Sequence, residues 1–491
     1  MLFNSYAFLF AFLPATYLLF YLVSRRSAVE ANLLLALASA AFYGWWDLRY
    51  VPLLAGSIAF NYLMARRLLA LRHARRATMP SLCTAVGANL ALLGYFKYAD
   101  FFILTANNLA DTGLAPLRLV LPLGVSFFTF TQIALLVDVH RGEVERLSAT
   151  DFALFVTYFP HLIAGPVLHH GEMMPQFASA AMHRRDPHLL NVGLAIFAFG
   201  LAKKTLLADT IAPYADAVFG AAAAGRAINA AEAWGGALAY TFQLYFDFSG
   251  YSDMAIGLSL MFGVRLPQNF ASPYKAASMI DFWRRWHMTL SRFLRDYLYI
   301  PLGGNRGSPW RRHANLMITM LLGGLWHGAG WTFVAWGGLH GVYLMVNHGW
   351  RAACGRRPRM APAFAGWRGR LLTFAAVVVA WVFFRADSFT TAARMIEAMA
   401  GLSSTTLAAT ANENWRRGAL LIVLLTACAW WMPNVAELFR LERPALTAAV
   451  AAFPTRLTWH ASLRWIIVSG LLLAAGIMTF HRNSPFLYFQ F

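Results

Sequence analysis

The sequence has 491 residues, of which 59% are hydrophobic and only 13% charged, whereas a soluble domain is roughly 25% charged. Lys and Arg number 41 against 22 Asp and Glu, but the basic residues cluster between apolar runs as cytoplasmic loops do, which argues against a nucleic-acid partner. Three distant cysteines without a CxxC pair exclude a disulfide scaffold and a cysteine-based zinc site.

This composition predicts an all-α polytopic membrane protein with about a dozen crossings, at ~20 residues for each spanning helix. The chain opens with a long apolar run that is followed by Arg25 and Arg26. A signal peptide carries its positive charge before the apolar core, so we expect a retained first helix with a periplasmic N-terminus. Runs at residues 33–46 and 52–64 predict two further crossings. They place the basic stretch from Arg66 to Arg76 in the cytoplasm, where Lys and Arg are in excess.

Further apolar runs continue along the chain. They cover residues 82–96, 119–137, 152–168, 189–207, 231–246, 251–264, 316–326, 330–346, 371–384, 419–431 and 465–480. Several are shorter than the ~20 residues of a complete crossing, and Gly or Pro interrupts them. Such runs are typical of broken or re-entrant helices buried in protein. We find no sign of a soluble domain or repeat and expect one membrane domain over residues 1–491.

Polar residues stand among apolar runs between Tyr245 and Gly341. Ionisable residues are costly in lipid and mark functional sites. His327, in LLGGLWHGAGWTF, has the side chain of a general base, because a neutral imidazole can accept a proton and return it. The structural alternative is a core histidine bonded to a helix carbonyl.

His287 lies in DFWRRWHMTLSRFLRD, a stretch too charged to span a bilayer. We expect residues 281–296 to form an amphipathic helix at the interface or in a cavity. Arg284 and Arg285 are candidates for binding a phosphate-bearing donor. The alternative is a surface helix held by ion pairs.

Asp247 and Asp253 flank Ser249 and Gly250, which predict a helix break, with Ser252 capping the helix that follows. The two acids are expected to orient a histidine, to bind a cation, or to pair with arginines. His161, His169 and His170, close to Pro160 and Pro166, are expected to be structural beside a bend. The histidines show neither HxxxH nor HExxH spacing, and GxSxG, a Walker P-loop and GxGxxG are missing. We therefore expect no metal, no serine triad and no nucleotide hydrolysis.

Three long motifs carry a family resemblance: QLYFDFSGYSDMAIGLSLMFG, FWRRWHMTLSRFLRDYLYIPLGGNRG and MLLGGLWHGAGWTFVAWGGLHG. Together they closely resemble the membrane-bound O-acyltransferases, and most of all the bacterial alginate O-acetyltransferase branch. The opening MLFNSYAFLFAFLP and the closing SPFLYFQF are similar to that branch too. The resemblance therefore covers essentially the whole chain, and its motif-bearing core lies at about residues 240–345.

The resemblance implies a ring of about 11 to 13 transmembrane or re-entrant helices around a thin centre with a catalytic tunnel. It implies that an acyl group, here expected to be acetyl, moves from a cytoplasmic thioester across the inner membrane towards a hydroxyl on the far side. The histidine of the WHG motif matches His327 and that of the WRRWH motif matches His287, so both are expected to be catalytic. Substrate or donor binding is expected of Arg284, Arg285, Asp247, Asp253, Trp326 and Asp296.

The expected donor is acetyl-CoA or an acyl carrier protein thioester, with no permanently bound cofactor. The expected partners are a periplasmic acetyltransferase or esterase-like protein and a polysaccharide acceptor. Around His140 the sequence reads LLVDVHRGE where alginate-type sequences tend to carry a tyrosine-rich stretch, and LHHGEMMPQF follows IAGPV. These departures favour another polymer, such as cellulose, peptidoglycan or a different exopolysaccharide.

From the residues alone, two other classes stay open. Broken helices with acids and histidines at mid-membrane depth are also typical of an ion-coupled secondary transporter. A haem- or metal-binding redox protein could use several of the 14 histidines.

Overall fold

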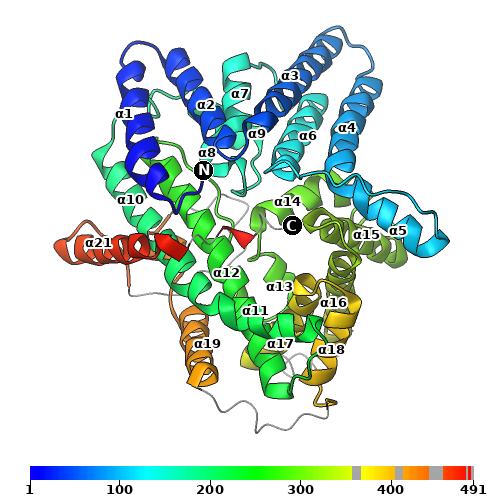
Figure 1. Cartoon of the computed structure of the whole chain (residues 1–491). Coiled ribbons are helices and arrows are strands. Elements are labelled where there is room, and N and C mark those ends of the chain that lie inside the picture. Colours follow the sequence, from blue (N-terminus) through cyan, green and yellow to red (C-terminus); the bar gives the residue numbers. More distant parts are fainter. Residues whose placement is uncertain (357–365, 404–412, 442–456, 483–484, 488–491) are drawn as a thin grey trace. The chain divides into compact units, whose positions relative to one another are not determined.

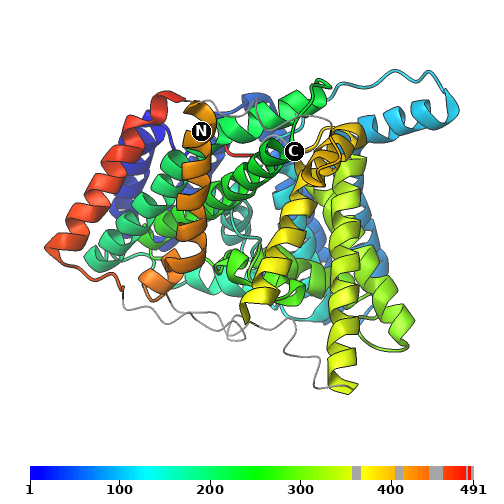
Figure 2. The same ribbon diagram turned by 90° about the horizontal axis from the view of Figure 1, so that it is seen from below.

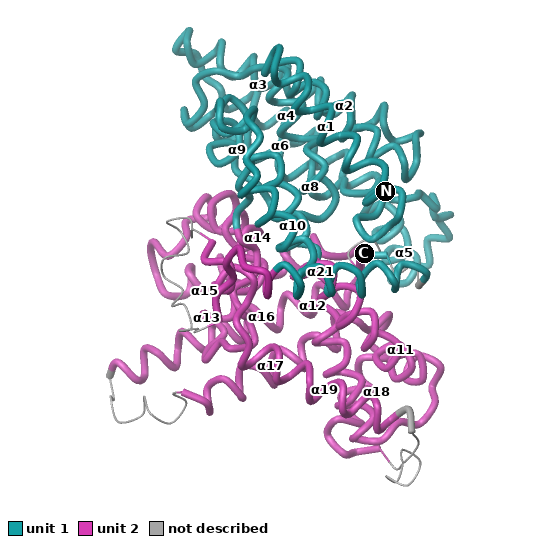
Figure 3. The backbone as a smooth tube through the Cα atoms, turned by 90° about the vertical axis from the view of Figure 1, so that its left-hand side faces the viewer, with its two compact units in different colours: residues 1–199, 251–267, 466–485 teal, residues 200–250, 268–465, 486–491 magenta. Residues whose placement is uncertain are grey.

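The computed structural model describes residues 1–356, 366–403, 413–441, 457–482 and 485–487 (Figure 1). Most of the closing motif SPFLYFQF lies outside these ranges. The described residues form helices and turns and contain no strand, which confirms the all-α prediction. The backbone groups into two compact units (Figure 3): unit 1 is Met1–Phe199, Tyr251–Pro267 and Ile466–Pro485, and unit 2 is Gly200–Gly250, Gln268–Trp465 and Phe486–Phe491.

Unit 1 contains the helices of the first 199 residues and most of α21. Their bounds are η1 Phe8–Phe12, α1 Leu13–Ser24, α2 Ala28–Gly44, η2 Leu48–Tyr50, α3 Val51–His73, α4 Met79–Leu93, η3 Gly94–Tyr98, α5 Ala99–Ala110, α6 Val125–Arg141, α7 Ala149–Thr157, α8 Phe159–Leu162, α9 His170–Phe177, most of α10 Pro187–Ala202, α21 Leu463–Met478 and η10 Phe480–Arg482. The three predicted N-terminal crossings correspond to α1, α2 and α3.

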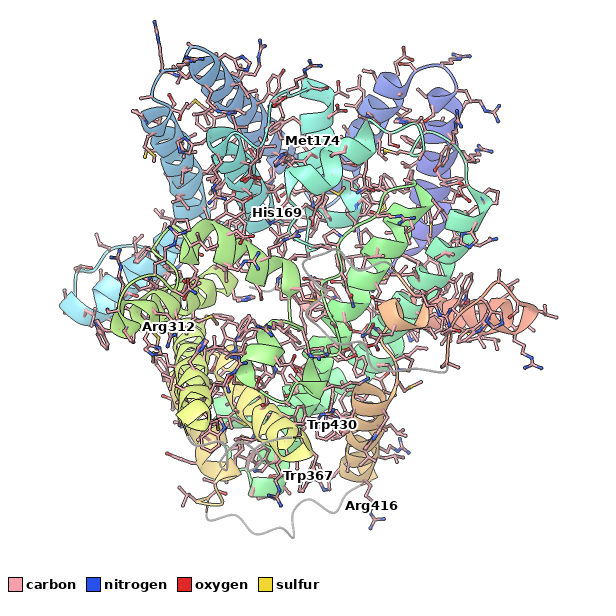
Figure 4. The ribbon with its side chains drawn as sticks, turned by 180° about the vertical axis from the view of Figure 1, so that it is seen from behind. His169, Met174, Arg312, Trp367, Arg416 and Trp430 are labelled. Atoms are coloured by element: carbon pink, nitrogen blue, oxygen red, sulfur yellow. The ribbon has the colours of Figure 1, made fainter. Side chains whose placement is uncertain are left out.

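Buried and half-buried polar side chains link the helices of unit 1. Asn61 on α3 and Asn89 on α4 exchange side-chain hydrogen bonds of 3.0 and 2.7 Å. His170 Nδ1 lies 2.8 Å from Asp138 Oδ2, and Figure 4 shows the neighbouring His169 and Met174 in this unit. Between helices that face lipid, such polar contacts supply attraction that apolar surfaces do not. They therefore help to fix which helices of unit 1 are neighbours.

Unit 2 contains the segment that carries the polar motifs. Its elements are η4 Lys203–Ala208, α11 Asp209–Ala223, α12 Ala230–Met261 up to Gly250, η5 Pro273–Lys275, α13 Met279–Trp283, α14 Met288–Leu294, η6 Arg295–Tyr299, α15 Pro309–His327, α16 Trp331–Arg356, α17 Gly366–Arg385, α18 Phe389–Met399, α19 Glu413–Trp431 and α20 Val435–Leu438. Serine caps set the beginnings of several helices: Ser278 accepts from the Asp281 N–H at α13, and Ser308 accepts from the Arg311 N–H at α15.

Three helical segments within the described ranges are long and apolar enough to cross a bilayer: Met79–Ala110, Pro187–Ala223 and Gly366–Arg385. Large apolar side chains are also exposed to the surroundings; Leu37 and Leu63 are each 63% exposed, as lipid-facing residues are. Exposed tryptophans stand at helix ends, among them Trp367 at the beginning of α17 (Figure 4) and Trp431 at the end of α19. Trp residues gather at membrane–water interfaces. The chain is a helical membrane protein, and the number of crossings, the ring and the tunnel stay predictions.

The predicted helix break at Ser249 and Gly250 is wrong. Helix α12 passes through both residues to Met261, so the runs 231–246 and 251–264 form one helix and Ser252 does not cap a second one. A Cβ added at Gly250 would lie 2.7 Å from the Gly200 carbonyl oxygen. The glycine therefore allows two helical segments of unit 2 to approach closely, and it does not interrupt α12.

The predicted amphipathic helix over residues 281–296 is also wrong. The chain forms α13, turns at residues 284–287, forms α14, and ends in the π-helical turn η6. His287 has φ +41°, a left-handed conformation that an α-helix cannot continue through. Most side chains from Arg285 to Leu290 are buried, so this segment belongs to the interior of unit 2.

Candidate active site

Helices α15 and α16 form a tight hairpin that positions His327. They lie side by side in unit 2 in both views (Figures 1 and 2). Glycines make this possible: a Cβ at Gly324 would lie 2.3 Å from the Phe333 carbonyl oxygen, and one at Gly337 would lie 2.2 Å from the Met320 carbonyl oxygen. Any side chain at either position would separate the helices. His327 is the last residue of α15, and the extended Gly328 turns the chain into α16.

Aromatic rings surround the His327 imidazole, which is 3% exposed. The ring centroid of Trp326 lies 4.9 Å away, that of Trp336 5.0 Å and that of Phe384 5.3 Å. All three rings are steeply inclined to the imidazole, at 70–87°. This packing excludes water from most of the ring and fixes its orientation, which is what a positioned general base requires.

His287 caps the N-terminus of α14 with its backbone and points its ring into the same interior. Its Nδ1 lies 3.0 Å from the Asn269 side-chain oxygen, which also accepts from the Thr289 hydroxyl at 3.0 Å and from the Thr289 backbone N–H at 3.4 Å. A backbone N–H can only donate, so the Asn269 atom facing it is the amide oxygen. His287 Nδ1 therefore carries a proton, and in the neutral ring the lone pair is on Nε2.

Burial sets the charge of His287, which lies between α13 and α14 and is 0% exposed. Desolvation lowers the pKa of His287 to about 3, from 6.5 in water. The imidazole is therefore neutral across physiological pH, with its tautomer fixed by Asn269. Sequence patterns gave no signal for Asn269, because it precedes His287 by 18 positions and contacts it only through the fold.

The structure brings the two predicted histidines together. The ring centroids of His287 and His327 are 6.3 Å apart, and the rings are inclined at 59°. Trp326 contacts both, with its ring 6.2 Å from His287. Two buried imidazoles and an indole therefore form one cluster within unit 2, although 40 residues separate the histidines in sequence.

The candidate binding residues Arg284, Arg285 and Asp296 differ in their exposure and in their partners. Arg284 is exposed, whereas Arg285 is buried and bonds through Nε to Asp281 Oδ1 at 2.8 Å and through Nη1 to the Ala271 carbonyl at 3.2 Å. Asp296 accepts two hydrogen bonds, of 2.6 and 3.0 Å, from the guanidinium of Arg295. Arg285 and Asp296 thus hold partners within the fold, while the guanidinium of Arg284 is open to a ligand.

The two acidic candidates lie in different environments on α12. Asp247 is 1% exposed and pairs with Lys204, whose Nζ lies 2.8 Å from Asp247 Oδ1. Its partner is therefore a lysine, in place of the arginine or histidine expected. Asp253 lies in unit 1 and is half-buried. Lys204 was missed although it stands inside the apolar run 189–207, where an ionisable residue is itself a signal.

His340 on α16 is a further buried histidine that sequence patterns did not single out for a role. Its ring is stacked on Phe282 at 5.9 Å and lies 4.8 Å from Trp336, which in turn contacts His327. Among the residues that the structure describes, no three or more His, Cys, Asp or Glu side chains are grouped to hold a metal ion.

Comparison with known proteins identifies the fold. Residues 89–389, which contain every candidate site residue, match the membrane-bound O-acyltransferase family. The chain belongs to this family. Membership confirms the resemblance carried by the three motifs and favours an acyltransferase over a transporter or a redox protein.

Relatives of this O-acyltransferase cover most of its length. A peptidoglycan O-acetyltransferase of Helicobacter pylori is 42% identical over 84% of this chain and 82% of that protein. A probable alginate O-acetylase of Pseudomonas aeruginosa is 46% identical over 81% of this chain and 75% of that protein. A teichoic acid D-alanyltransferase of Streptococcus thermophilus is 26% identical over 53% of this chain and 68% of that protein.

Proposed function

We propose that this enzyme transfers an acetyl group from a cytoplasmic thioester across the inner membrane towards hydroxyls of a cell-surface polysaccharide. The observation that carries the proposal is the pair of buried imidazoles, with centroids 6.3 Å apart, inside the part of the chain that matches the acyltransferase family. A hydroxyl needs a base to attack a thioester, and the proximity of His327 and His287 supports a shared role at one reacting centre.

His327 is the proposed general base. As the acceptor oxygen attacks the thioester carbonyl, His327 takes the hydroxyl proton. The carbon–sulfur bond then breaks, and the imidazolium returns the proton to the departing thiolate. The new ester and the free thiol are the products, so protons and electrons balance without a redox cofactor. The aromatic rings at 4.9–5.3 Å from His327 keep bulk water away, which favours transfer over hydrolysis.

His287 is proposed to bind the donor or to orient the acceptor. Because Asn269 accepts from Nδ1, the ring presents Nε2 as an acceptor, suited to a hydroxyl proton. The exposed Arg284 is proposed to meet the anionic head of acetyl-CoA or of an acyl carrier protein thioester. No permanently bound cofactor is proposed.

The polymer is proposed to be peptidoglycan or an exopolysaccharide, because the relatives are named for peptidoglycan and alginate acetylation. A periplasmic acetyltransferase or esterase-like protein is proposed to complete transfer to it. These assignments rest on the resemblance and on the names of the relatives.

The test compares the O-acetyl content of extracted peptidoglycan and exopolysaccharide in cells that carry the intact protein or a variant at equal membrane levels. His327→Ala is expected to lower ester content at least about 10²-fold, since general-base help is worth typically 10²–10⁴-fold. His188→Ala, an exposed histidine of α10 in unit 1, is the matched control and is expected to keep the ester.

Full acetylation by correctly inserted His327→Ala protein would contradict the general-base assignment. Equal acetylation in cells that lack the protein altogether would contradict acetylation of the polymers examined.

A further inference from the structure

Three ionisable side chains meet in the interior of unit 2, away from the imidazole pair. Lys204 Nζ lies 2.6 Å from Asp209 Oδ1 and 2.8 Å from Asp247 Oδ1. The exposed fractions of the three side chains are only 4%, 9% and 1%. Burying an ammonium and two carboxylates costs several kcal/mol for each ion, and their attraction returns this only with excellent geometry. The presence of this buried ion group is therefore better explained by a functional role than by a contribution to folding stability.

The backbone around Lys204 is adapted to this contact. Lys204 lies in the π-helical turn η4, inside the membrane-capable segment Pro187–Ala223. π-Helical turns within α-helices are rare and are frequent at functional sites. A Cβ at Gly250 would lie 3.0 Å from the Lys204 backbone nitrogen, so the glycine lets α12 approach η4 closely enough for Asp247 to reach the ammonium.

The second oxygen of Asp247 holds a segment that is distant in sequence. Asp247 Oδ2 accepts a 2.9 Å hydrogen bond from the backbone N–H of Leu487, 240 residues further along the chain. Phe486 and Leu487 are 2% and 7% exposed. A buried backbone N–H needs an acceptor, and in this apolar interior the carboxylate supplies one. Lys204 keeps that carboxylate in place and compensates its charge.

The ring of Phe248 connects this segment to His287. The Phe486 ring lies 5.5 Å from the ring of Phe248, the residue next to Asp247. Phe248 in turn lies 4.7 Å from His287, edge to face at 87°. The ion pair and the bonded segment therefore fix the wall against which His287 rests.

We propose that Lys204, Asp247 and residues 486–487 form a positioning element that sets the orientation of His287, as a positioning role within the proposed acyl transfer. Lys204 holds Asp247, Asp247 holds the Leu487 amide, and Phe486 holds Phe248 against the imidazole. None of these residues needs to contact the substrate.

The first test reads the anchoring itself and needs no enzymatic activity. Leu487→Cys is introduced after Cys83, Cys354 and Cys428 are replaced by Ala, and the rate of labelling by a small maleimide is measured in membranes. The cysteine keeps the backbone N–H, so it is expected to label slowly. Adding Asp247→Ala is expected to accelerate labelling at least about tenfold, as the loss of ~1.4 kcal/mol of local stability would.

Asp247→Ala leaves Lys204 paired with Asp209, so it does not leave a buried ammonium without an acid. Asp216→Asn is the matched control, because Asp216 forms an exposed ion pair with Arg385 at 2.7 Å. The control is expected to label at the original rate. An unchanged rate in the Asp247→Ala protein would overturn the proposal.

The second test separates a positioning role from a folding role by comparing variants that lack or keep the backbone N–H of residue 487. Leu487→Pro removes the N–H that Asp247 accepts, while Leu487→Ala keeps it. With a thioester donor, kcat of Leu487→Pro is expected to be at least about tenfold below that of Leu487→Ala, with similar KM, because a small misplacement of a reacting group slows chemistry more than binding. Equal kcat for the two variants would overturn the positioning role.

The two tests separate the failure of this inference from that of the proposed function. Rapid labelling after Asp247→Ala together with full turnover by His327→Ala would keep the anchored segment and reject the base. Unchanged labelling together with an inactive His327→Ala protein would reject the anchored segment and keep the base.

Discussion

His287 is buried, and its hydrogen bond to Asn269 fixes its tautomer. Its burial makes the folding stability of the protein depend on pH. The folded protein holds this imidazole neutral, because burial lowers the pKa of His287 to about 3, while the unfolded chain titrates it near 6.5. The unfolded state therefore binds a proton that the folded state excludes as pH falls below 6.5. Folding stability contributed by the neutral ring is complete above that pH and is lost on acidification towards pH 3.

We expect the thermal midpoint of the purified protein to fall between pH 7 and pH 4.5, and to fall less steeply in His287→Gln. The slope that one such histidine contributes is at most about 1.4 kcal/mol per pH unit. Glutamine keeps a donor for Asn269 but does not titrate. Midpoints of the wild type and of His287→Gln would be measured by thermal denaturation in detergent, with His188→Gln as the exposed control. Parallel curves for His287→Gln and the wild type would contradict a neutral buried His287.

At the scale of elements, the α15–α16 hairpin depends on glycines that leave no room for a side chain. Gly337→Ala would place Cβ 2.2 Å from the Met320 carbonyl oxygen, and backbone cannot yield as a flexible side chain can. We expect this substitution to destabilise the protein by about 1–3 kcal/mol and to displace His327. Gly349→Ala on the same helix meets nothing within 4 Å and is expected to be neutral or stabilising. Thermal midpoints and acetyl transfer of the two variants check the prediction, which equal midpoints would contradict.

Sequence patterns predicted where helices lie better than they predicted whether neighbouring helical segments are continuous or broken. Pro160 predicted a bend correctly, since α7 ends at Thr157 and α8 begins at Phe159. Ser249 and Gly250 predicted a break wrongly, because a glycine that ends a helix and one that admits a neighbouring helix look alike in one sequence. The prediction for residues 281–296 failed for a related reason: Arg285 is buried and bonded to Asp281, and the left-handed backbone of His287 divides the segment, neither of which the alternation of charged and apolar residues reveals.

The candidate site was predictable only in its principal histidines. His287 and His327 stood out because ionisable residues are rare among apolar runs, and the structure brings their rings together. Asn269 and Leu487 act through one hydrogen bond each to a residue far away in sequence. Such pairings follow from the fold and leave no local pattern. The backbone N–H of Leu487 carries no side-chain identity at all.

At the scale of the whole molecule, basic residues predict which loops face the cytoplasm. Helices α1, α2 and α3 are separated by turns near Arg25 and near Leu48, and α3 is followed by Arg75. With a periplasmic N-terminus, the first and third of these positions lie in the cytoplasm. We expect Leu48→Cys to react with an impermeant maleimide in intact spheroplasts and Arg75→Cys to react only in inverted vesicles. Replacing the native cysteines by Ala provides the background. Labelling of Arg75→Cys in spheroplasts would contradict the orientation.

The backbone at His287 already has the left-handed conformation that glycine adopts most readily. His287→Gly therefore removes the imidazole without asking the chain to bend differently, and it leaves a ring-sized hollow lined by Phe248, Phe270 and Trp326. We expect free imidazole added to the medium to occupy that hollow and to replace the missing nitrogen. Under the proposed acetyl transfer, we expect cells with this variant to acetylate their surface polymer only while imidazole is supplied, so that the imidazole concentration sets the amount of polymer modification.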